Sequence, residues 1–512
     1  MTVEHDRSAR PGGRGRPPRG APREFPVELD RELETPLPVQ LAAALREAID
    51  AGTLRPAEAV PATRELARRI GVARGVVVAS YEQLIAEGYL VATHGRGTAV
   101  NPQLERMSAP AGGRSDAQGA RSGSAPGVSS NRNATGTPGA DDGVLGRAPL
   151  APGEPIPSAI NSPAWRAAWR EAAARAHVVA PALGDDRLRA EIADHLRRMR
   201  ATARSAGDVI VTAGTREGLG LLLTALGTTR GRGLVVGVED PGLPSLRGVA
   251  ARHGARIVAL PTDSAGLDTA RLPEGVLDLV IVTPSHQYPL GGSLPLVRRR
   301  ELLDWAGRGG VVVVEDDFDS ELRFTGSPLP TLAALEDDVA GSVVLLGTFS
   351  RTVAPSLSAG YMLAPAGIRA LVEPVRRELG GPVSSVVQVA LAHYLATGEL
   401  RRHTARLLRR YAERRDLVSE RLAGTHGVRV RPMDGGLHAV IEFVGQDPAD
   451  LRDREEAVVR LTRRAGLGAE PLGGYWQRNG AGMAGLVIGL GGPDDVAFDE
   501  ALRSLAAVLR EA

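Results

Sequence analysis

The chain has 512 residues, of which 43% are hydrophobic and 24% charged, and its formal net charge is +2. This composition is ordinary for a soluble protein of two folded domains, and it excludes binding to nucleic acid through overall charge. No cysteine is present, which excludes disulfides and cysteine-based metal sites. The N-terminus is too polar for a signal peptide and no apolar run reaches the roughly 18 residues of a membrane span, so we expect a cytoplasmic protein without a membrane partner.

Residues 1–30 have the composition of a disordered basic arm. Proline and glycine accompany six arginines between Arg7 and Arg23. Within this arm, Arg14-Gly15-Arg16-Pro17 matches the core of an AT-hook, whose two arginines fit a narrow minor groove. The sequence leaves open whether this core is used or the arm is a solvated tail.

Residues 31–100 show the pattern of a small helical domain. Apolar positions from Val39 to Ile49 recur at helical spacing. Thr63 is a suitable N-cap for a second helix, Gly71 ends that helix, and a third helix runs over about 73–87. The short turn between the last two helices predicts a helix-turn-helix, and the glycine-containing stretch after them predicts a β-wing.

Several motifs in this domain carry a family resemblance. They read Val60-Pro61-Ala62-Thr63-Arg64-Glu65-Leu66-Ala67, Gly71-Val72-Ala73-Arg74, Tyr81-Glu82-Gln83-Leu84, Glu87-Gly88-Tyr89-Leu90 and Gly95-Arg96-Gly97-Thr98. The segment resembles the winged-helix DNA-binding domain of the GntR family, which implies double-stranded operator DNA as a partner. The resemblance implies DNA contacts by Arg64, Arg74, Ser80, Gly95, Arg96, Gly97 and Thr98. Arginine suits such contacts because it pairs with phosphate or forks onto a guanine edge.

The start of the expected recognition helix departs from the family pattern. Ala73, Gly75, Val76 and Ala79 stand where the family usually has a serine cap and polar base readers. Loss of a cap costs about 1 kcal/mol, and apolar replacements make fewer hydrogen bonds to bases. We therefore expect DNA binding with altered or weaker specificity. The alternative is that the protein acts only as a structural partner and that its DNA-binding domain no longer works.

A change of composition marks the domain boundary. Residues 101–158 are rich in Gly, Ser, Ala, Pro and Asn and show almost no apolar periodicity, which predicts a flexible linker. From residue 159 to 512, helical patterns alternate with short apolar runs at 209–212, 234–238, 257–260, 279–283, 311–314 and 343–346. Because these runs show no alternating polarity, they predict an α/β domain with a mostly parallel sheet covered on both faces. We expect a smaller C-terminal α/β part from about residue 374.

Four stretches of this domain carry a second resemblance. They are Glu239–Gly242, Thr283–Pro289, Glu315–Glu321 and Val343–Tyr361. Together with the winged helix, they resemble the fold-type I aminotransferase-like domain of MocR-type regulators in the GntR superfamily. The resemblance implies a one-component, sequence-specific transcription regulator with pyridoxal phosphate as cofactor. It also implies a head-to-tail homodimer in which each linker carries a DNA-binding domain over the other subunit.

Arg351 stands where the family has the lysine that forms the aldimine with the cofactor. A guanidinium stays protonated and does not form the aldimine that a deprotonated amine does. No other lysine replaces it, because all 62 lysine or arginine positions of the chain are arginine. We therefore expect no covalent cofactor bond and no aminotransferase activity.

The remnant pocket implied by the resemblance has lost further groups. It comprises Gly214, Thr215, Leu243, His286, Asp316, Phe318, Thr348, Ser350, Arg351 and Ser358. Asp316, or Asp317 in a register shifted by one, matches the carboxylate for the pyridine nitrogen. Phe318 and Leu243 replace two tyrosines, and Ser358 replaces the phosphate-binding arginine. Each lost charge-assisted bond costs on the order of 1.5 to 3 kcal/mol, which moves a micromolar site into the millimolar range.

Three interpretations of the pocket remain open from the sequence. The domain retains pyridoxal phosphate without a covalent bond, as an alternative function. A different small anionic effector binds to Arg351 and the hydroxyls. Finally, the domain is only a scaffold for dimerisation, with Arg351 paired to Asp316 across an empty site.

Overall fold

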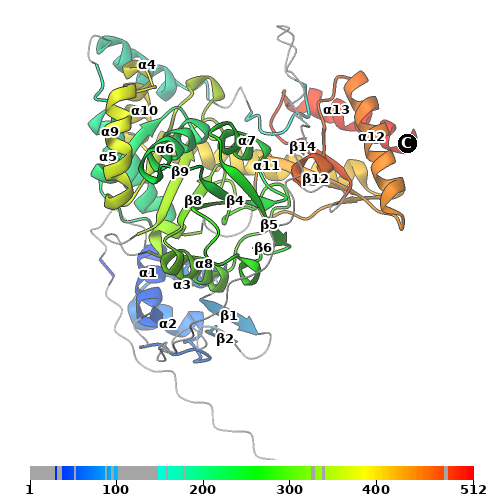
Figure 1. The fold of residues 1–512 in the computed structure, drawn as a ribbon. Coiled ribbons are helices and arrows are strands. Elements are labelled where there is room, and N and C mark those ends of the chain that lie inside the picture. The colour runs from blue at the N-terminus through cyan, green and yellow to red at the C-terminus, as the bar shows by residue number, and fades with distance from the viewer. Residues whose placement is uncertain are drawn as a thin grey trace, which may run out of the picture. The chain divides into compact units, whose positions relative to one another are not determined.

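The computed structural model describes residues 29–30, 37–50, 53–86, 89–93, 97–101, 148–156, 160–176, 179–323, 329–336, 341–477 and 483–511. The chain divides into two compact units, Met1–Ala109 and Pro110–Ala512 (Figure 1). The expected basic arm with its AT-hook core lies outside the described residues, apart from Leu29 and Asp30. The expected linker up to residue 147 also lies outside them, apart from Asn101. Among the described helices, none combines the length and apolar character needed to cross a bilayer.

The N-terminal unit is the predicted winged helix. Its helices are α1 (Leu37–Asp50), α2 (Thr63–Ile70) and α3 (Arg74–Ala86), followed by strands β1 (Leu90–Thr93) and β2 (Gly97–Val100). The two strands pair antiparallel, with Leu90 opposite Val100, and form the wing. The expected order of helix, helix-turn-helix and wing is therefore confirmed.

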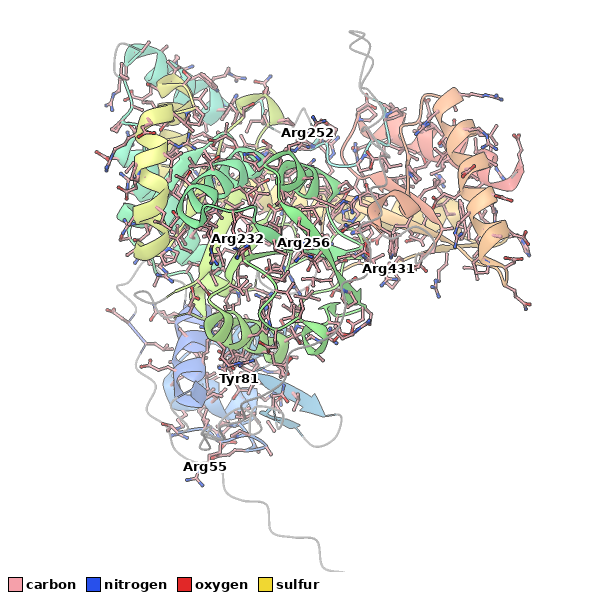
Figure 2. The ribbon with its side chains drawn as sticks, viewed as in Figure 1. Arg55, Tyr81, Arg232, Arg252, Arg256 and Arg431 are labelled. Carbon is pink, nitrogen blue, oxygen red and sulfur yellow. The ribbon has the colours of Figure 1, made fainter. Side chains whose placement is uncertain are left out.

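The core of this unit joins its three helices. Leu45 of α1, Leu66 of α2 and Leu84 of α3 are buried. Tyr81 lies inside the unit, whereas Arg55 lies at its surface (Figure 2). The Tyr81 hydroxyl donates a hydrogen bond of 2.8 Å to the carbonyl of Pro61, and burial raises the pKa of this phenol.

The two ends of helix α2 are capped in different ways. Gly71 ends it as predicted, with a left-handed φ of 67° that glycine adopts at little cost. The prediction of Thr63 as N-cap is wrong, because Ala62 occupies that position and makes no side-chain cap bond. Thr63 instead accepts a hydrogen bond of 3.4 Å from Nε of Arg74, which ties the start of α3 to α2.

The C-terminal unit is built on an eight-stranded sheet in the order β3-β10-β9-β8-β7-β4-β5-β6. The strands are β3 (Val209–Thr212), β4 (Val235–Asp240), β5 (Arg256–Asp263), β6 (Gly266–Leu267), β7 (Leu279–Val282), β8 (Val312–Asp317), β9 (Val343–Thr348) and β10 (Gly360–Leu363). The run β9-β8-β7-β4-β5 is parallel, while β10 is antiparallel to both its neighbours and β6 to β5. The expected mostly parallel sheet is confirmed.

Helices cover both faces of this sheet, as the continuous apolar runs require. One face packs on α6 (Thr215–Arg230), α7 (Pro244–Arg252) and α9 (Ala366–Leu379), and the other on α4 (Pro163–Ala174), α5 (Asp186–Arg200), α8 (Leu296–Gly309) and α10 (Ser385–Ala396). Figure 1 shows α6 and α7 on one side of the sheet and α8 on the other. Along β9, Val344 and Leu346 face the first layer, and Val343 and Leu345 face the second.

A smaller lobe completes the unit. It has an antiparallel sheet in the order β11-β12-β14-β13, made of β11 (Val428–Val430), β12 (His438–Phe443), β13 (Glu470–Pro471) and β14 (Gly485–Gly489). Its helices are α11 (Glu399–Leu422), α12 (Pro448–Arg464) and α13 (Asp495–Glu511) (Figure 1). Short 3-10 helices, η3 (Ala206–Asp208), η4 (Thr269–Arg271), η5 (Leu332–Ala334), η6 (Pro355–Leu357) and η7 (Leu472–Tyr475), lie in the connections of the unit.

Two expected boundaries are wrong. The smaller part does not begin near residue 374, which lies inside α9, because α10 still packs in the core of the large sheet. From α10 onward, the first residue in the core of the smaller lobe is Leu407 of α11. The expected linker also ends too late, because Leu150 and Ile156 are buried in that same core.

Arg200, the last residue of α5, is a buried connection between helix and sheet and is only 1% exposed. Its Nε donates to the carbonyl of Leu329 at 2.7 Å, and its Nη2 donates to the hydroxyl of Ser285 at 2.9 Å. Its Nη1 pairs with the carboxylate of Asp317, which is the last residue of β8, and also reaches Ser320. The guanidinium thus joins the end of α5 to the end of β8.

Arg200→Leu is expected to lower the free energy of unfolding by about 3 to 5 kcal/mol, because it leaves the Asp317 carboxylate buried and unpaired. Urea unfolding followed by tryptophan fluorescence measures this, since Trp165, Trp169, Trp305 and Trp476 all lie in the C-terminal unit. Arg197→Leu on the same helix is the matched control, because Arg197 is 58% exposed and pairs at the surface with Asp194. Equal unfolding midpoints for the two variants would contradict the role given to Arg200.

Candidate ligand cavity and helix-turn-helix surface

A cavity of about 440 Å³ lies in the C-terminal unit where several predicted pocket residues meet. Its walls include nine residues predicted from the sequence: Gly214, Thr215, Leu243, Asp316, Phe318, Thr348, Ser350, Arg351 and Ser358. Topology explains their convergence, since β8 and β9 are parallel neighbours whose carboxyl ends meet at one edge, the usual ligand edge of an α/β sheet. The cavity therefore occupies the place where the sequence predicts the remnant pocket.

Several groups on the cavity wall are hydrogen-bond donors. Helix α6 starts at Thr215 after Gly214, and no side-chain cap satisfies its first turn, whose N–H groups lack intrahelical partners. The positive end of the helix dipole favours an anion at this point. The hydroxyls of Thr215 and Ser350 and the guanidinium of Arg351 border the same space. These donors suit an anionic group.

Asp316, in contrast, offers a hydrogen-bond acceptor. It lies on β8 and is only 4% exposed. Its Oδ1 has no hydrogen-bond partner among the described residues. Burial raises the pKa of Asp316 to about 8; the neighbouring Asp317 raises it further, and Arg351 opposes the shift. Such an unsatisfied buried oxygen requires an explanation, and a cavity beside it provides one.

Arg351 does not pair with Asp316 among the described residues, in contrast to one interpretation of the sequence. Its guanidinium lies instead against the α-carbon of Gly153, where an added Cβ would collide with Nη1, Cζ and Nη2. Pro152, Gly153 and Glu154 all line the cavity. Their proline and glycine content matches that of the linker, so nothing in the sequence marks them as cavity residues.

The aromatic wall of the cavity is built in layers. Phe318 borders the cavity, and His286 stacks behind it with ring centroids 5.9 Å apart. His286 therefore does not line the cavity, and its prediction as a pocket residue is wrong. Nδ1 of His286 is hydrogen-bonded to the carboxylate of Asp319 at 3.0 Å. Tyr288 and His438 line the cavity and were missed, although Tyr288 belongs to a motif that carries the resemblance. Burial lowers the pKa of His438 to about 4.

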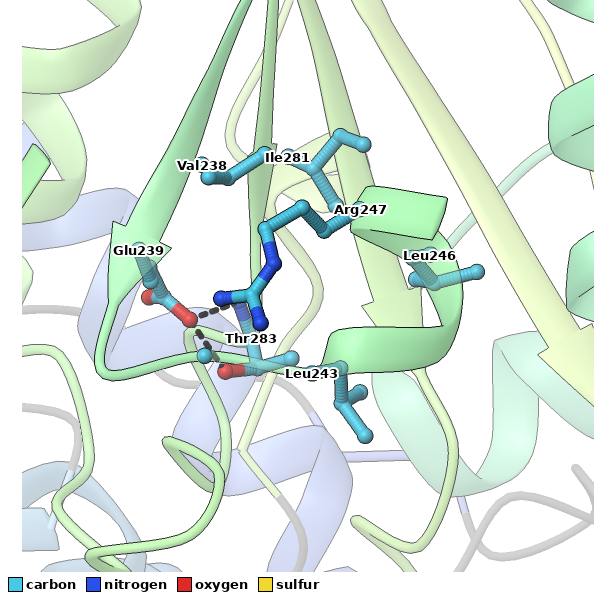
Figure 3. Close-up of a pocket in the computed structure, with 8 residues that line it drawn as sticks. Val238, Glu239, Leu243, Leu246, Arg247, Ile281 and Thr283 are labelled. Atoms are coloured by element: carbon cyan, nitrogen blue, oxygen red, sulfur yellow. Dashed lines mark hydrogen bonds between the residues drawn. The ribbon is translucent and has the colours of Figure 1, made fainter. Parts of the chain in front are cut away.

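A second, much smaller space of about 20 Å³ shares Leu243 with the cavity (Figure 3). Oε2 of Glu239 accepts hydrogen bonds from the amide and the hydroxyl of Thr283, at 3.2 and 2.5 Å. Burial raises the pKa of Glu239 to about 7. Arg247 of α7 lines the same space. This small space has room for about one water molecule and is not a site for an organic ligand.

In the N-terminal unit, the predicted DNA contacts divide into three groups. Arg64 on α2, Arg74 at the start of α3 and Gly97 at the start of β2 are exposed, and Thr98 is partly exposed. Ser80 is fully buried, and its hydroxyl lies 2.8 Å from the carbonyls of both Pro38 and Val76, which share its one donor hydrogen. Its prediction as a DNA contact is wrong, because this side chain packs α3 against α1. Gly95 and Arg96 lie outside the described residues.

Comparison with known proteins agrees with this architecture. Residues 37–100 match the family described as "Bacterial regulatory proteins, gntR family", and residues 153–465 match "Aminotransferase class I and II". Among solved structures, an archaeal alanine:glyoxylate aminotransferase superimposes with a TM-score of 0.64 at 21% identity, covering 72% of this chain and 92% of the other. This structural likeness shows a shared fold.

Curated relatives extend over both units. The chain is 40% identical over 472 residues to the HTH-type pyridoxine biosynthesis transcriptional regulator PdxR of Corynebacterium glutamicum, which covers 92% of this chain and 96% of the relative. It is 30% identical over 486 residues to the probable rhizopine catabolism regulatory protein MocR of Rhizobium meliloti, which covers 93% and 94%. The chain thus belongs to the MocR-type DNA-binding transcription regulators of the GntR superfamily, in which a winged helix precedes an aminotransferase-like domain.

Proposed function

We propose that this regulator is a catalytically inactive, one-component sensor whose cavity binds a small anionic effector without a covalent bond. The observation that carries this proposal is Arg351 on the cavity wall, in the position of the family lysine, in a chain without lysine. Transamination passes the cofactor aldehyde between such a lysine and the substrate, so no residue of this chain can take that part.

The cavity fits pyridoxal phosphate only in part. Asp316 has an unsatisfied oxygen for a ring nitrogen, and the start of α6 offers N–H groups to a phosphate. However, Phe318 has no hydroxyl to donate to the ring phenolate, and Ser358 has no charge for the phosphate. The residues therefore do not form a tight cofactor site. The relative named for pyridoxine biosynthesis makes pyridoxal phosphate the first compound to test as an effector.

We further propose that two copies form a head-to-tail homodimer that places two winged helices on one operator. The family resemblance supports this arrangement, and a dimer suits half-sites spaced by about one turn of DNA. Binding of bacterial operator DNA places the protein in the cytoplasm. The winged helix would span residues 31–100, and Arg64, Arg74 and the wing would contact the duplex.

Arg64→Ala and Arg74→Ala are each expected to weaken binding to the promoter region upstream of the gene by about 1 to 3 kcal/mol and to reduce its salt dependence by about one ion. Gel shifts across a salt series measure both effects. Arg55→Ala is the matched control, because Arg55 is an exposed arginine of the same unit outside the helix-turn-helix (Figure 2). Absence of any shift with wild-type protein at low salt would favour a structural partner without DNA binding.

Pyridoxal phosphate is expected to bind wild-type protein only in the millimolar range and to leave no borohydride-trapped adduct in the cavity. Calorimetry and mass spectrometry measure these two outcomes. The restored variant R351K/F318Y/L243Y/S358R is the comparison, and it is expected to bind more tightly and to give a trapped adduct at position 351. A micromolar affinity in wild-type protein would show that the remaining groups suffice.

Asp316→Asn is expected to stabilise the protein at about pH 8.5, and to stabilise it less at about pH 5.5. Burial raises the folded-state pKa of Asp316 to about 8, above its ordinary value. Between the ordinary pKa and the raised pKa, the folded state binds more protons than the unfolded state. Wild-type stability therefore falls as pH rises through this window, and Asn removes that loss. Urea unfolding at both pH values measures it, with the exposed Asp453→Asn on α12 as control. An equal effect of Asp316→Asn at both pH values would contradict the shift.

A further inference from the structure

Helix α6 carries a cation at the end where the helix dipole disfavours one. Arg216 is the second residue of this helix, directly after Thr215. The start of a helix is the positive end of its dipole, so an arginine is favourable in the last turn, where Arg230 lies, and unfavourable in the first. Natural proteins break such local rules mainly at functional sites, where another interaction compensates. An anion bound at the start of α6 would compensate for Arg216.

The protein's own carboxylates do not provide this compensation. Glu217 is the acidic residue of the first turn, and both of its carboxylate oxygens are engaged by other groups. Oε1 pairs with Nη2 of the buried Arg376 at 2.5 Å, and Oε2 accepts a hydrogen bond from the amide of Ala213 at 3.0 Å. In the part of the chain that the structure describes, no carboxylate forms an ion pair with Arg216. Its charge is therefore available to a ligand.

Arg216 borders the cavity of about 440 Å³ and is itself exposed, so the cavity is open to solvent at this residue. Thr215 and Ser350 contribute hydroxyls to the same wall. The start of α6 lies beside the end of β9, because a Cβ added to Gly214 would be 3.7 Å from Oγ1 of Thr348. Backbone N–H groups, hydroxyls and one guanidinium are thus gathered around the start of α6.

A second observation indicates that the cavity holds a ligand. Oδ1 of Asp316 is buried without a hydrogen-bond partner among the described residues, and Asp316 lines the same cavity. Burial raises the pKa of Asp316 to about 8, so this side chain is mostly protonated at neutral pH and opposes an anion little. Asp319 of the wall is hydrogen-bonded to His286 at 3.0 Å, and Glu154 adds one more carboxyl group against two arginines. The wall therefore accepts an anion.

We propose that Arg216 determines the specificity of this cavity by binding the anionic group of the effector at the start of α6. The inference rests on the proposed anionic effector and adds the residue that recognises it. A guanidinium, hydroxyls and helix N–H groups together suit an oxyanion, that is, a phosphate or carboxylate group. The family resemblance places the phosphate-binding arginine at position 358, which is serine here, so this chain supplies its cation from a different element.

Calorimetry on the full-length protein tests the role of Arg216, with inorganic phosphate and acetate as probes at constant ionic strength. Arg216→Ala is expected to weaken binding on the order of tenfold, because it removes a charge-assisted hydrogen bond. A loss with phosphate alone or with acetate alone would support the proposal and identify the group that the effector carries. Arg252→Ala is the matched control, because Arg252 is an exposed arginine at the far end of the neighbouring helix α7 and does not line the cavity (Figure 2).

Two further variants separate recognition by charge from a structural role. Arg216→Lys keeps the cation and is expected to retain more of the affinity than Arg216→Gln, which does not; equal losses would overturn the proposal. In buffer without either anion, Arg216→Ala is expected to keep or slightly raise the midpoint of urea unfolding, because it removes a cation from the positive end of the helix dipole. A lower midpoint would show that Arg216 stabilises the fold and would overturn its assignment to the ligand.

The same titrations distinguish failure of this inference from failure of the proposed function. If neither anion gave saturable heat with wild-type protein, the proposed anionic effector would fail, and the role of Arg216 with it. If either anion bound wild-type protein and Arg216→Ala equally well, the anionic effector would stand and Arg216 would have no part in its recognition.

Discussion

The pairing of Arg200 with Asp317 is the interaction on which the cavity edge of the large sheet depends. Three consecutive carboxyl side chains, Glu315, Asp316 and Asp317, are largely buried along β8. Asp317 receives the guanidinium, and Glu315 accepts a hydrogen bond from the amide of Leu332 at 2.7 Å. Because a buried carboxylate is costly without such partners, α5 and the residues after β8 must meet at this point. That requirement fixes the cavity edge of the sheet.

Asp316 lacks such compensation. Natural proteins satisfy nearly all buried polar atoms, and exceptions concentrate where a ligand completes the site. The cavity has donors at the start of α6 and an unsatisfied acceptor at Asp316, so it suits a ligand that carries both an anionic group and a hydrogen-bond donor. This combination is the basis of the effector that we propose.

The replacement of the family lysine by Arg351 changes what the cavity can do. Arg351 lies on the cavity wall against Gly153, which belongs to the chain that enters the C-terminal unit. An arginine supplies no amine for an aldimine, but it places a charged planar group on the wall. This substitution is the basis on which we propose an inactive site that binds an anion.

The sequence by itself determined the winged helix, the parallel sheet and the absence of a lysine that could form an aldimine, because helical spacing, apolar runs and residue types are properties of the chain that need no tertiary contact. Through the family resemblance it also predicted nine of the residues that line the cavity. Strand ends of a parallel sheet share the edge at which they meet. Only the tertiary structure decided that Ser80 is buried, that His286 lies behind Phe318, and that residues 148–156 belong to the folded lobe. These three features depend on which groups, distant in the sequence, come within bonding distance in the fold. The linker-like composition of residues 148–156 gives no sign that their backbone packs against glycines far along the chain.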